Sequence, residues 1–270
     1  MTVFAILLAL FLLLGILWIM LIAGRTNNKS TDKFTGIRYA HRGLHGEGRP
    51  ENSLAAFKAA VDKGYAIELD VHLLRDGYLA VIHDDTLLRT AGEDVRIENL
   101  TRAELKNYRL EGSDEHIPTF AEVLEVVDGK VPLLIELKTG KNNPTLCSAL
   151  MWELRDYKGL YCIESFDPRC VGWFKKNAPS VVRGQLADNF FKNKGNLSFG
   201  YRLVLSLLFL NAYSQPDFVA FNFKERNFLS NRISKDFWNV RGFCWTVKSE
   251  KEMRKAEKLG YAVIFENFEP

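Results

Sequence analysis

The chain has 270 residues, 47% of them apolar, and a formal net charge of +3. This length allows one large domain or two ordinary ones, and the apolar content suffices for a sizeable core. The near-neutral charge gives no case for a nucleic-acid-binding protein. The four cysteines lack metal-ligand spacing, and Cys162 and Cys244 lie in apolar strand-like runs, so we expect buried free thiols rather than disulfides.

The first segment is a candidate membrane anchor. Residues 3–23 carry no charge and are about as long as the ~20 residues that cross a bilayer. A cleaved signal peptide is the alternative, but the apolar run exceeds the roughly 7–15 residues of a signal core. We therefore predict a single-pass anchor over residues 1–24 and a polar linker over 25–35. Lys and Arg residues follow the anchor and none precedes it, so the positive-inside rule predicts a cytoplasmic globular part.

Short strands alternate with helices from residue 36 onward. A first strand over residues 37–41 leads into a turn rich in Gly and Pro over 43–50. Asn52 or Ser53 then caps a helix with one apolar face, and Gly64 ends that helix as a C-cap residue would.

The second strand, residues 67–71, is the most informative one. Its apolar residues alternate with Glu68 and Asp70, so the two acids share one face. Two neighbouring carboxylates need a cation, a basic side chain or a shared proton between them. A solvated acidic edge strand is the bland alternative, and the recurrence of polar pairs nearby speaks against it.

The later elements continue the alternation. An extra strand over 78–82 precedes an irregular excursion over 84–118, which contains a capping box at residues 101–104. Further strands are predicted over residues 131–138, 160–166, 181–186, 218–222, 242–247 and 262–265, with helices over 120–127, 146–157, 171–176 and 249–259 between them.

Eight strands that alternate with helices predict an α/β fold, a closed TIM-type (β/α)8 barrel over residues 36–270. An open doubly wound sheet is the alternative, but no Gly-rich phosphate loop follows the first strand. The sequence stops soon after the eighth strand, so the last α element is expected to be truncated.

One segment permits two interpretations. Residues 203–210 are nearly all apolar. They could form a loop that touches a membrane on the active-site side, or the buried helix that links the fifth and sixth strands, and we favour the buried helix.

Polar residues recur at the carboxyl ends of the predicted strands, where barrel enzymes hold their sites. The oxygen-rich set Glu68, Asp70 and Glu136 suits a hard divalent cation such as Mg²⁺ or Ca²⁺. Arg42 and Lys138 suit an anionic group such as phosphate. Two histidines, His41 and His83, with a hard metal and two basic side chains, indicate acid–base chemistry on a phosphate ester. Any one of these residues alone is more often structural, so the inference depends on the whole set.

The motifs 40–43 (AHRG), 50–53 (PENS), 67–71 (IELDV), 75–77 (RDG) and 81–84 (VIHD) resemble the signature of glycerophosphodiester phosphodiesterases in order and spacing. Residues 135–138, 165–166 and 245–247 extend the resemblance over nearly the whole globular part. The resemblance implies a TIM-type barrel that hydrolyses glycerophosphodiesters to glycerol 3-phosphate and an alcohol.

The resemblance also implies individual roles. His41 and His83 would be the general acid and base, and a neighbouring hydroxyl of the substrate would attack phosphorus to give a cyclic phosphate. The remaining residues would bind one divalent cation (Glu68, Asp70 and Glu136, with Glu51 close enough to join), the phosphate (Arg42 and Lys138) and the glycerol (Phe166 and Trp245). The chain departs from the family pattern at Leu74, Lys248 and Glu266, which affects the expected head-group preference.

We therefore expect a membrane-tethered, metal-dependent phosphodiesterase of lipid metabolism, acting on deacylated phospholipids, lysophospholipids or a glycerol-phosphate polymer. A lysophospholipase D acting on membrane lysolipids is the alternative, and a catalytically silent binding module is a third possibility. Such a binder has no physical need for a paired acid and base. The sequence does not indicate an oligomeric state.

Overall fold

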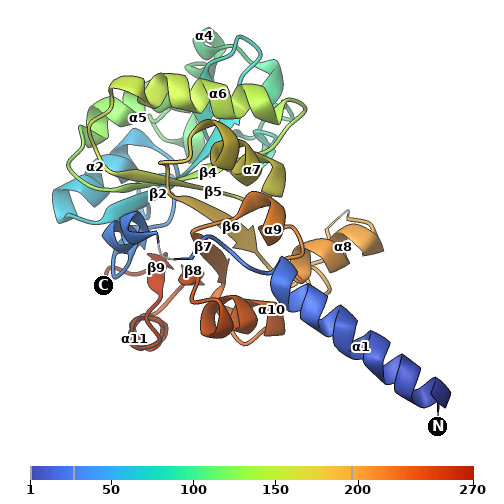
Figure 1. Cartoon of the computed structure of the whole chain (residues 1–270). Coiled ribbons are helices and arrows are strands. Elements are labelled where there is room, and N and C mark those ends of the chain that lie inside the picture. Colours follow the sequence, from blue (N-terminus) through green and yellow to red (C-terminus); the bar gives the residue numbers. More distant parts are fainter. Residues whose placement is uncertain (1, 27, 196) are drawn as a thin grey trace.

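The computed structural model describes residues 2–26, 28–195 and 197–270. Its centre is a closed barrel of eight parallel strands, in which β1 pairs with both β2 and β9. This confirms the predicted TIM-type barrel (Figure 1). The strands are β1 (Arg38–Ala40), β2 (Ala66–Leu73), β4 (Leu133–Leu137), β5 (Tyr161–Ser165), β6 (Arg183–Ala187), β7 (Phe218–Asn222), β8 (Arg241–Val247) and β9 (Ala262–Phe265), and β3 (Leu79–Val81) pairs antiparallel with β2.

Helices cover the outside of the barrel and fill its connections. The α-helices are α1 (Thr2–Leu21), α2 (Leu54–Lys63), α3 (Leu88–Ala91), α4 (Arg102–Leu105), α5 (Phe120–Val127), α6 (Asn143–Glu153), α7 (Pro168–Asn177), α8 (Phe199–Ser206), α9 (Asn211–Ser214), α10 (Leu229–Arg232) and α11 (Glu250–Lys258). Short 3-10 or π turns are η1 (Lys29–Phe34), η2 (Ile97–Asn99), η3 (Leu110–Gly112), η4 (Leu154–Asp156), η5 (Phe223–Glu225) and η6 (Ile233–Phe237). No helix follows β9 in residues 266–270, as the sequence predicts.

The inward side chains divide the barrel into an apolar floor and an acidic mouth. Leu134 and Glu136 follow one another on the inner face of β4, and Cys162 and Glu164 do so on β5. The apolar member lies toward the amino end of each strand. Phe34 of η1 joins this inner apolar cluster, so residues 29–34, expected to belong to a linker, close the amino end of the barrel. Polar chemistry is thereby confined to the carboxyl end.

The cap of α2 settles an ambiguity of the sequence. The Ser53 hydroxyl accepts a hydrogen bond from Ala56 N at 3.1 Å, and Gly64 closes the helix at φ 73°. Ser53 is therefore the N-cap, and Asn52 beside it is free to serve the acidic mouth. All four cysteines are buried free thiols, as expected.

The preferred interpretation of residues 203–210 is wrong in part. The segment does link β6 to β7, but α8 ends at Ser206 and Ser206 is its single buried residue. The outer layer here is completed instead by α9, whose Tyr213 ring packs against Gly172 of α7. Because α9 already covers the barrel, α8 is left projecting outward (Figure 1).

Candidate active site

Three carboxylates meet at the mouth of the barrel. Glu68 and Asp70 lie on β2, and Glu136 lies beside Asp70 in the register of β4. One oxygen from each lies within 4.8 Å of the others, and all three side chains are buried. Crowding of like charges away from water disfavours full ionisation, so this arrangement calls for a cation.

The pKa values of the three acids diverge because their surroundings differ. Burial and the charges of Asp70 and Glu136 raise the pKa of Glu68 well above its ordinary value. Burial likewise raises the pKa of Glu136 to about 7, although Lys138 opposes the shift. Burial also acts on Asp70, but Lys138, His83 and Arg42 outweigh it and hold its pKa below the ordinary value. Asp70 is therefore the permanently charged member of the group.

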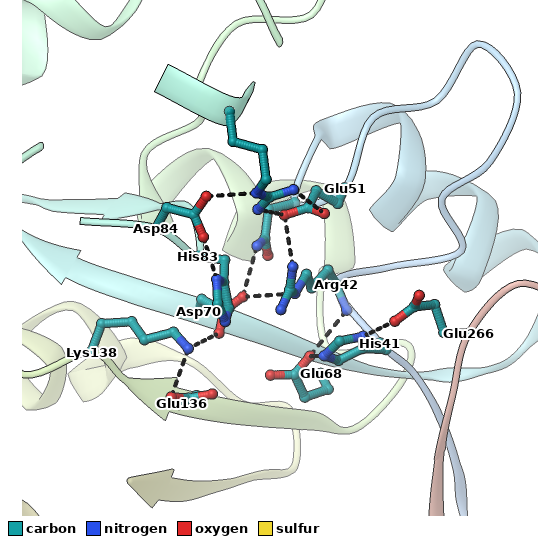
Figure 2. A network of polar contacts seen from close by, with 12 residues as sticks. His41, Arg42, Glu51, Glu68, Asp70, His83, Asp84, Glu136, Lys138 and Glu266 are labelled. Carbon is teal, nitrogen blue, oxygen red and sulfur yellow. Dashed lines mark hydrogen bonds and ion pairs between the residues drawn. The ribbon is translucent and has the colours of Figure 1, made fainter. Parts of the chain in front are cut away.

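Two basic side chains reach into the acidic mouth (Figure 2). Lys138 Nζ lies 3.0 Å from Asp70 Oδ1 and 2.7 Å from Glu136 Oε1. Arg42 donates from its backbone N to Glu68 at 3.0 Å, and its Nε lies 3.5 Å from Asp70. The mouth thus combines three acids with two cations, which is suited to an anionic group and a metal ion together.

Each histidine is oriented by a carboxylate. His41 Nδ1 donates to Glu266 Oε2 at 2.6 Å, and His83 Nδ1 donates to Asp84 Oδ1 at 2.6 Å (Figure 2). Binding at Nδ1 leaves Nε2 as the nitrogen for proton transfer. Burial is the main cause that lowers the pKa of both rings. Two imidazoles that are mostly neutral near pH 7 can exchange protons with a substrate.

A cavity of about 90 Å³ lies between these groups. Its wall contains both histidines, Arg42 and two of the acids, together with an apolar side formed by Phe166, Leu186, Trp245 and Ile264. The Phe166 and Trp245 rings meet edge to face with centroids 5.9 Å apart. The cavity therefore has one charged side and one aromatic side, as an amphipathic ligand requires.

The structure does not bring Glu51 into the carboxylate group. Its carboxylate pairs with Arg42 at 2.8 Å and with Arg89 at 2.6 Å. Arg89 also binds Asp84 at 2.6 Å, so it joins Glu51 to the partner of His83. Glu51 is thus a support for Arg42 and His83 rather than a fourth acid at the cluster.

Three further residues belong to the site although the sequence did not single them out for it. Asn52 Nδ2 donates to Asp70 Oδ2 at 2.8 Å, and Glu266 holds His41. Glu164 on β5 is buried beside Glu136, and its pKa is raised by burial and by Glu68. The sequence could have indicated Glu164, because it is an acid within an apolar strand, as Glu68 and Glu136 are.

Comparisons with known proteins agree with this geometry. The model of the glycerophosphoryl diester phosphodiesterase family matches residues 41–198, more than half of the chain. A glycerophosphodiester phosphodiesterase of Caldanaerobacter subterraneus subsp. tengcongensis is 32% identical over 232 residues, covering 82% of this chain and 89% of that protein. A lysophospholipase D of Rattus norvegicus is 32% identical over 145 residues, covering 49% of this chain and 45% of that protein.

A solved structure shares the fold. An Oleispira antarctica phosphodiesterase, solved in complex with the product sn-glycerol-3-phosphate, superposes with a TM-score of 0.70 at 24% identity. The match covers 87% of this chain and 94% of that one. At this identity the likeness supports the barrel and not the assignment of individual residues.

Proposed function

This chain belongs to the glycerophosphoryl diester phosphodiesterase family and is an enzyme of that class, and from this premise we propose how it works and where. It hydrolyses glycerophosphodiesters to glycerol 3-phosphate and an alcohol by histidine acid–base catalysis beside one divalent cation. The observation that carries the proposal is the pair of carboxylate-held histidines on the wall of a cavity that also contains Glu68 and Glu136 of the acid cluster.

The two imidazoles divide the proton transfers. One takes the proton of the attacking hydroxyl of the substrate, and the other gives a proton to the oxygen of the departing alcohol, which leaves a cyclic phosphate. Water then opens this ring to give glycerol 3-phosphate, with the two imidazoles exchanging their roles. Glu266 holds His41 and Asp84 holds His83 at Nδ1, so each ring presents Nε2 in a fixed orientation. The bound phosphate, being negative, raises the pKa of a nearby imidazole and so allows one ring to arrive protonated.

The acid cluster suits a hard divalent cation, Mg²⁺ or Ca²⁺. Glu68, Asp70 and Glu136 would hold it, because they offer oxygens within 4.8 Å of one another. A second group, His41, His45 and Glu266, also gathers three donor atoms, but its two nitrogens suit such cations less well. When bound, the ion would neutralise phosphate charge as a Lewis acid.

The other residues of the site bind the two ends of the substrate, its phosphate and its glycerol. Arg42 and Lys138 supply positive charge for the phosphate oxygens. Phe166 and Trp245 form the apolar wall against which the carbon chain of the glycerol lies. Water is thereby excluded from one side of the reacting phosphate.

We place the enzyme at a membrane. α1 is 20 residues long, has no buried residue, and is long and apolar enough to span a bilayer. Its C-terminal end is bound to the barrel, since Trp18 donates to Leu207 O and Trp238 donates to Ile19 O. Because the end of α1 makes contacts with the folded domain, we favour a retained anchor over a cleaved signal peptide. The positive charges that follow α1 favour a cytoplasmic barrel.

A lysophospholipase D activity is the second candidate. It is favoured by the similarity to the rat lysophospholipase D and by the proposed position at a membrane, where lysolipids reside. Hydrolysis of lysolipid without hydrolysis of glycerophosphocholine or glycerophosphoethanolamine would select this candidate.

The test is a turnover assay of the full chain in detergent, with glycerophosphodiesters and lysolipids as substrates and Mg²⁺, Ca²⁺ and Mn²⁺ added in turn. His41→Ala should lower kcat by about 10²–10⁴-fold, the usual contribution of a general acid or base. His116→Ala is the control, because His116 lies outside the cavity and pairs with Glu122. Unchanged turnover in His41→Ala, or full activity after chelation, contradicts the proposal.

A further inference from the structure

α1 is held tightly at the amino ends of the strands. A Cβ on Gly24 would lie 2.5 Å from Pro216 O and 2.9 Å from the Val240 side chain, so the backbones are in close contact. Arg25 Nε and Nη2 bind the Asp217 carboxylate at 2.5 and 2.8 Å. Pro216 and Asp217 precede β7, and Val240 precedes β8. The anchor is therefore joined to the barrel without a flexible linker.

Toward its N-terminus, α1 approaches the face that holds the acidic site. Trp18 Nε1 donates to Leu207 O at 3.0 Å. The neighbouring Ser206 accepts hydrogen bonds from Phe190 N and from the Ser230 hydroxyl. Phe190 and Ser230 follow the carboxyl ends of β6 and β7. The segment from Trp18 to Arg25 thus lies against the barrel wall, and the exposed remainder of α1 projects away from the barrel (Figure 1). From these contacts we infer that a membrane around α1 lies on the side of the active-site mouth.

α8 projects on the same side as α1 (Figure 1), and it carries exposed aromatic rings. Phe199 is 64% exposed and Tyr201 is 67% exposed, both in the first turn of the helix. Leu197 just before the helix is also exposed. Aromatic and aliphatic side chains gathered this way suit the headgroup region of a bilayer, where an apolar ring with a polar edge is favoured.

The charge of this segment complements an anionic surface. Residues 189–216 contain no Asp or Glu, whereas they contain Lys192, Lys194 and Arg202. Lys192 pairs with Glu225 at 2.6 Å, while Lys194 is exposed beside α8. Each basic residue near a membrane surface adds to the attraction by anionic lipid.

We propose that residues 197–202, the start of α8 with the residues just before it, bind the surface of an anionic bilayer as a second membrane contact beside α1. The proposal rests on the anchor role given to α1 above. Two contacts, one spanning and one interfacial, fix the tilt of the barrel so that its mouth faces the lipid.

The same connection reaches the cavity wall. Phe190 packs on Phe166 with ring centroids 6.0 Å apart, and the adjacent Phe191 packs on Phe199 at 6.2 Å. The aromatic rings from Trp245 through Phe166 thus continue toward α8. The membrane contact is therefore mechanically linked to the apolar wall of the cavity.

The test uses single cysteines labelled with an environment-sensitive fluorophore in the full chain. The four native thiols are buried, so an introduced surface cysteine is labelled selectively. Tyr201→Cys reports on α8 and Leu10→Cys on α1. Trp152→Cys on α6 is the matched control, because Trp152 is as exposed as Tyr201, at 67%. Each protein is reconstituted in vesicles of phosphatidylcholine and phosphatidylglycerol that contain a brominated lipid quencher.

The expected result is strong quenching at positions 10 and 201 and little at 152. A helix in the interface buries its apolar face by roughly 5–10 Å, so the probe on α8 should lose about half its emission or more. Lys194→Glu with Arg202→Glu, or vesicles of phosphatidylcholine alone, should reduce quenching at 201 several-fold and leave position 10 unchanged.

The possible failures are distinguishable. Quenching at 10 but not at 201 overturns the α8 contact and leaves the anchor standing. Quenching at neither position overturns the anchor as well. A blue shift at 201 that depends on protein concentration and not on the quencher would assign α8 to a second copy of the chain and overturn the proposal. Turnover of soluble diesters is measured separately and bears only on the catalytic proposal.

Discussion

Gly43 shows how a single motif residue shapes the rim of the site. It has φ 81°, and a Cβ would lie 2.9 Å from the Ala56 carbonyl carbon in the first turn of α2. Gly43 therefore lets the chain turn sharply after Arg42 and pass close to the helix. This requirement explains the glycine after the His-Arg pair without reference to chemistry.

We predict that Gly43→Ala lowers the free energy of unfolding by about 2–4 kcal/mol, because backbone strain and overpacking add. Gly48→Ala is the matched control, since Gly48 has φ 70° and open space around it. That control should cost only about 1 kcal/mol, the strain alone. Thermal unfolding in detergent measures both, and equal losses would disprove the packing argument.

Glu266 is a departure from the family pattern that the structure explains. Its carboxylate accepts from His41 and also lies 3.3 Å from Lys248, the other unusual residue of that region. The hydrogen bond from His41 lowers the pKa of Glu266 to about 2 from 4.5. The two departures therefore form one ion-paired unit that positions the histidine.

A consequence for acid stability follows. A carboxyl whose pKa is depressed in the folded state contributes stability that is full above the unfolded pKa of 4.5 and is lost as the pH falls through about 2. Between these limits the wild type should lose on the order of 2 kcal/mol more than Glu266→Gln. Glu269→Gln, at an exposed acid paired with Lys63, should follow the wild type. Parallel curves for wild type and Glu266→Gln would refute this.

The structure brings together the residues that the sequence analysis chose next to strand ends, and it adds partners remote in the chain that the sequence analysis did not choose. His41, Glu68 and His83 could be chosen because their strands end at one face. Glu266 could not, since its role depends on β9 closing against β1. Asn52 was considered as a helix cap because its side-chain amide is suited to capping. In the structure the same amide donates a hydrogen bond to Asp70 instead.

At the scale of elements, the attachment of α1 to the barrel depends on the close contact of Gly24 with Pro216 and Val240. Gly24→Ala should lower the free energy of unfolding by about 1–3 kcal/mol, because the new methyl group meets the backbone of Pro216. Gly15→Ala within α1 has nothing within 4 Å and should be neutral or slightly stabilising. Faster proteolysis between α1 and the barrel in detergent would also show that the contact of Gly24 with the barrel is weakened. Equal behaviour of the two variants would mean that α1 is not seated here.

The elements could be predicted where periodicity was regular. The helix over 120–127 and the strand pattern agree with the structure because caps and alternation define their ends. The apolar segment 203–210 misled because composition alone does not separate a core helix from a projecting one. Its burial is decided by α9, a four-residue helix without a periodic signal.

For the whole molecule, the parallel pairing of β2 with β4 within the closed barrel brings their acids together. Adding Mg²⁺ or Ca²⁺ should therefore raise Tm, since an ion that binds only the folded state stabilises by about 2.7 kcal/mol at a concentration of 100 Kd. Glu136→Gln should abolish the shift. Glu164→Gln should retain it, because Glu164 is not part of the cluster. No shift in the wild type with either ion would contradict the cation site.

The architecture of the whole chain was the most predictable feature. Eight repeats of strand and helix without a Gly-rich loop leave a closed barrel as the simplest arrangement. The attachment of the C-terminal end of α1 to the barrel could not be foreseen, because it depends on side-chain contacts of Trp18 and Arg25 with segments about 190 residues away.

The close packing of Gly24 against the barrel has a kinetic consequence. With α1 anchored in a bilayer as proposed, a barrel held this closely to its anchor cannot move away from the membrane, so it meets substrate only in a thin layer above the lipid. For a lysolipid substrate, the rate should then follow the mole fraction of that lipid in the bilayer and fall when inert lipid dilutes it, even while the total amount of substrate stays constant.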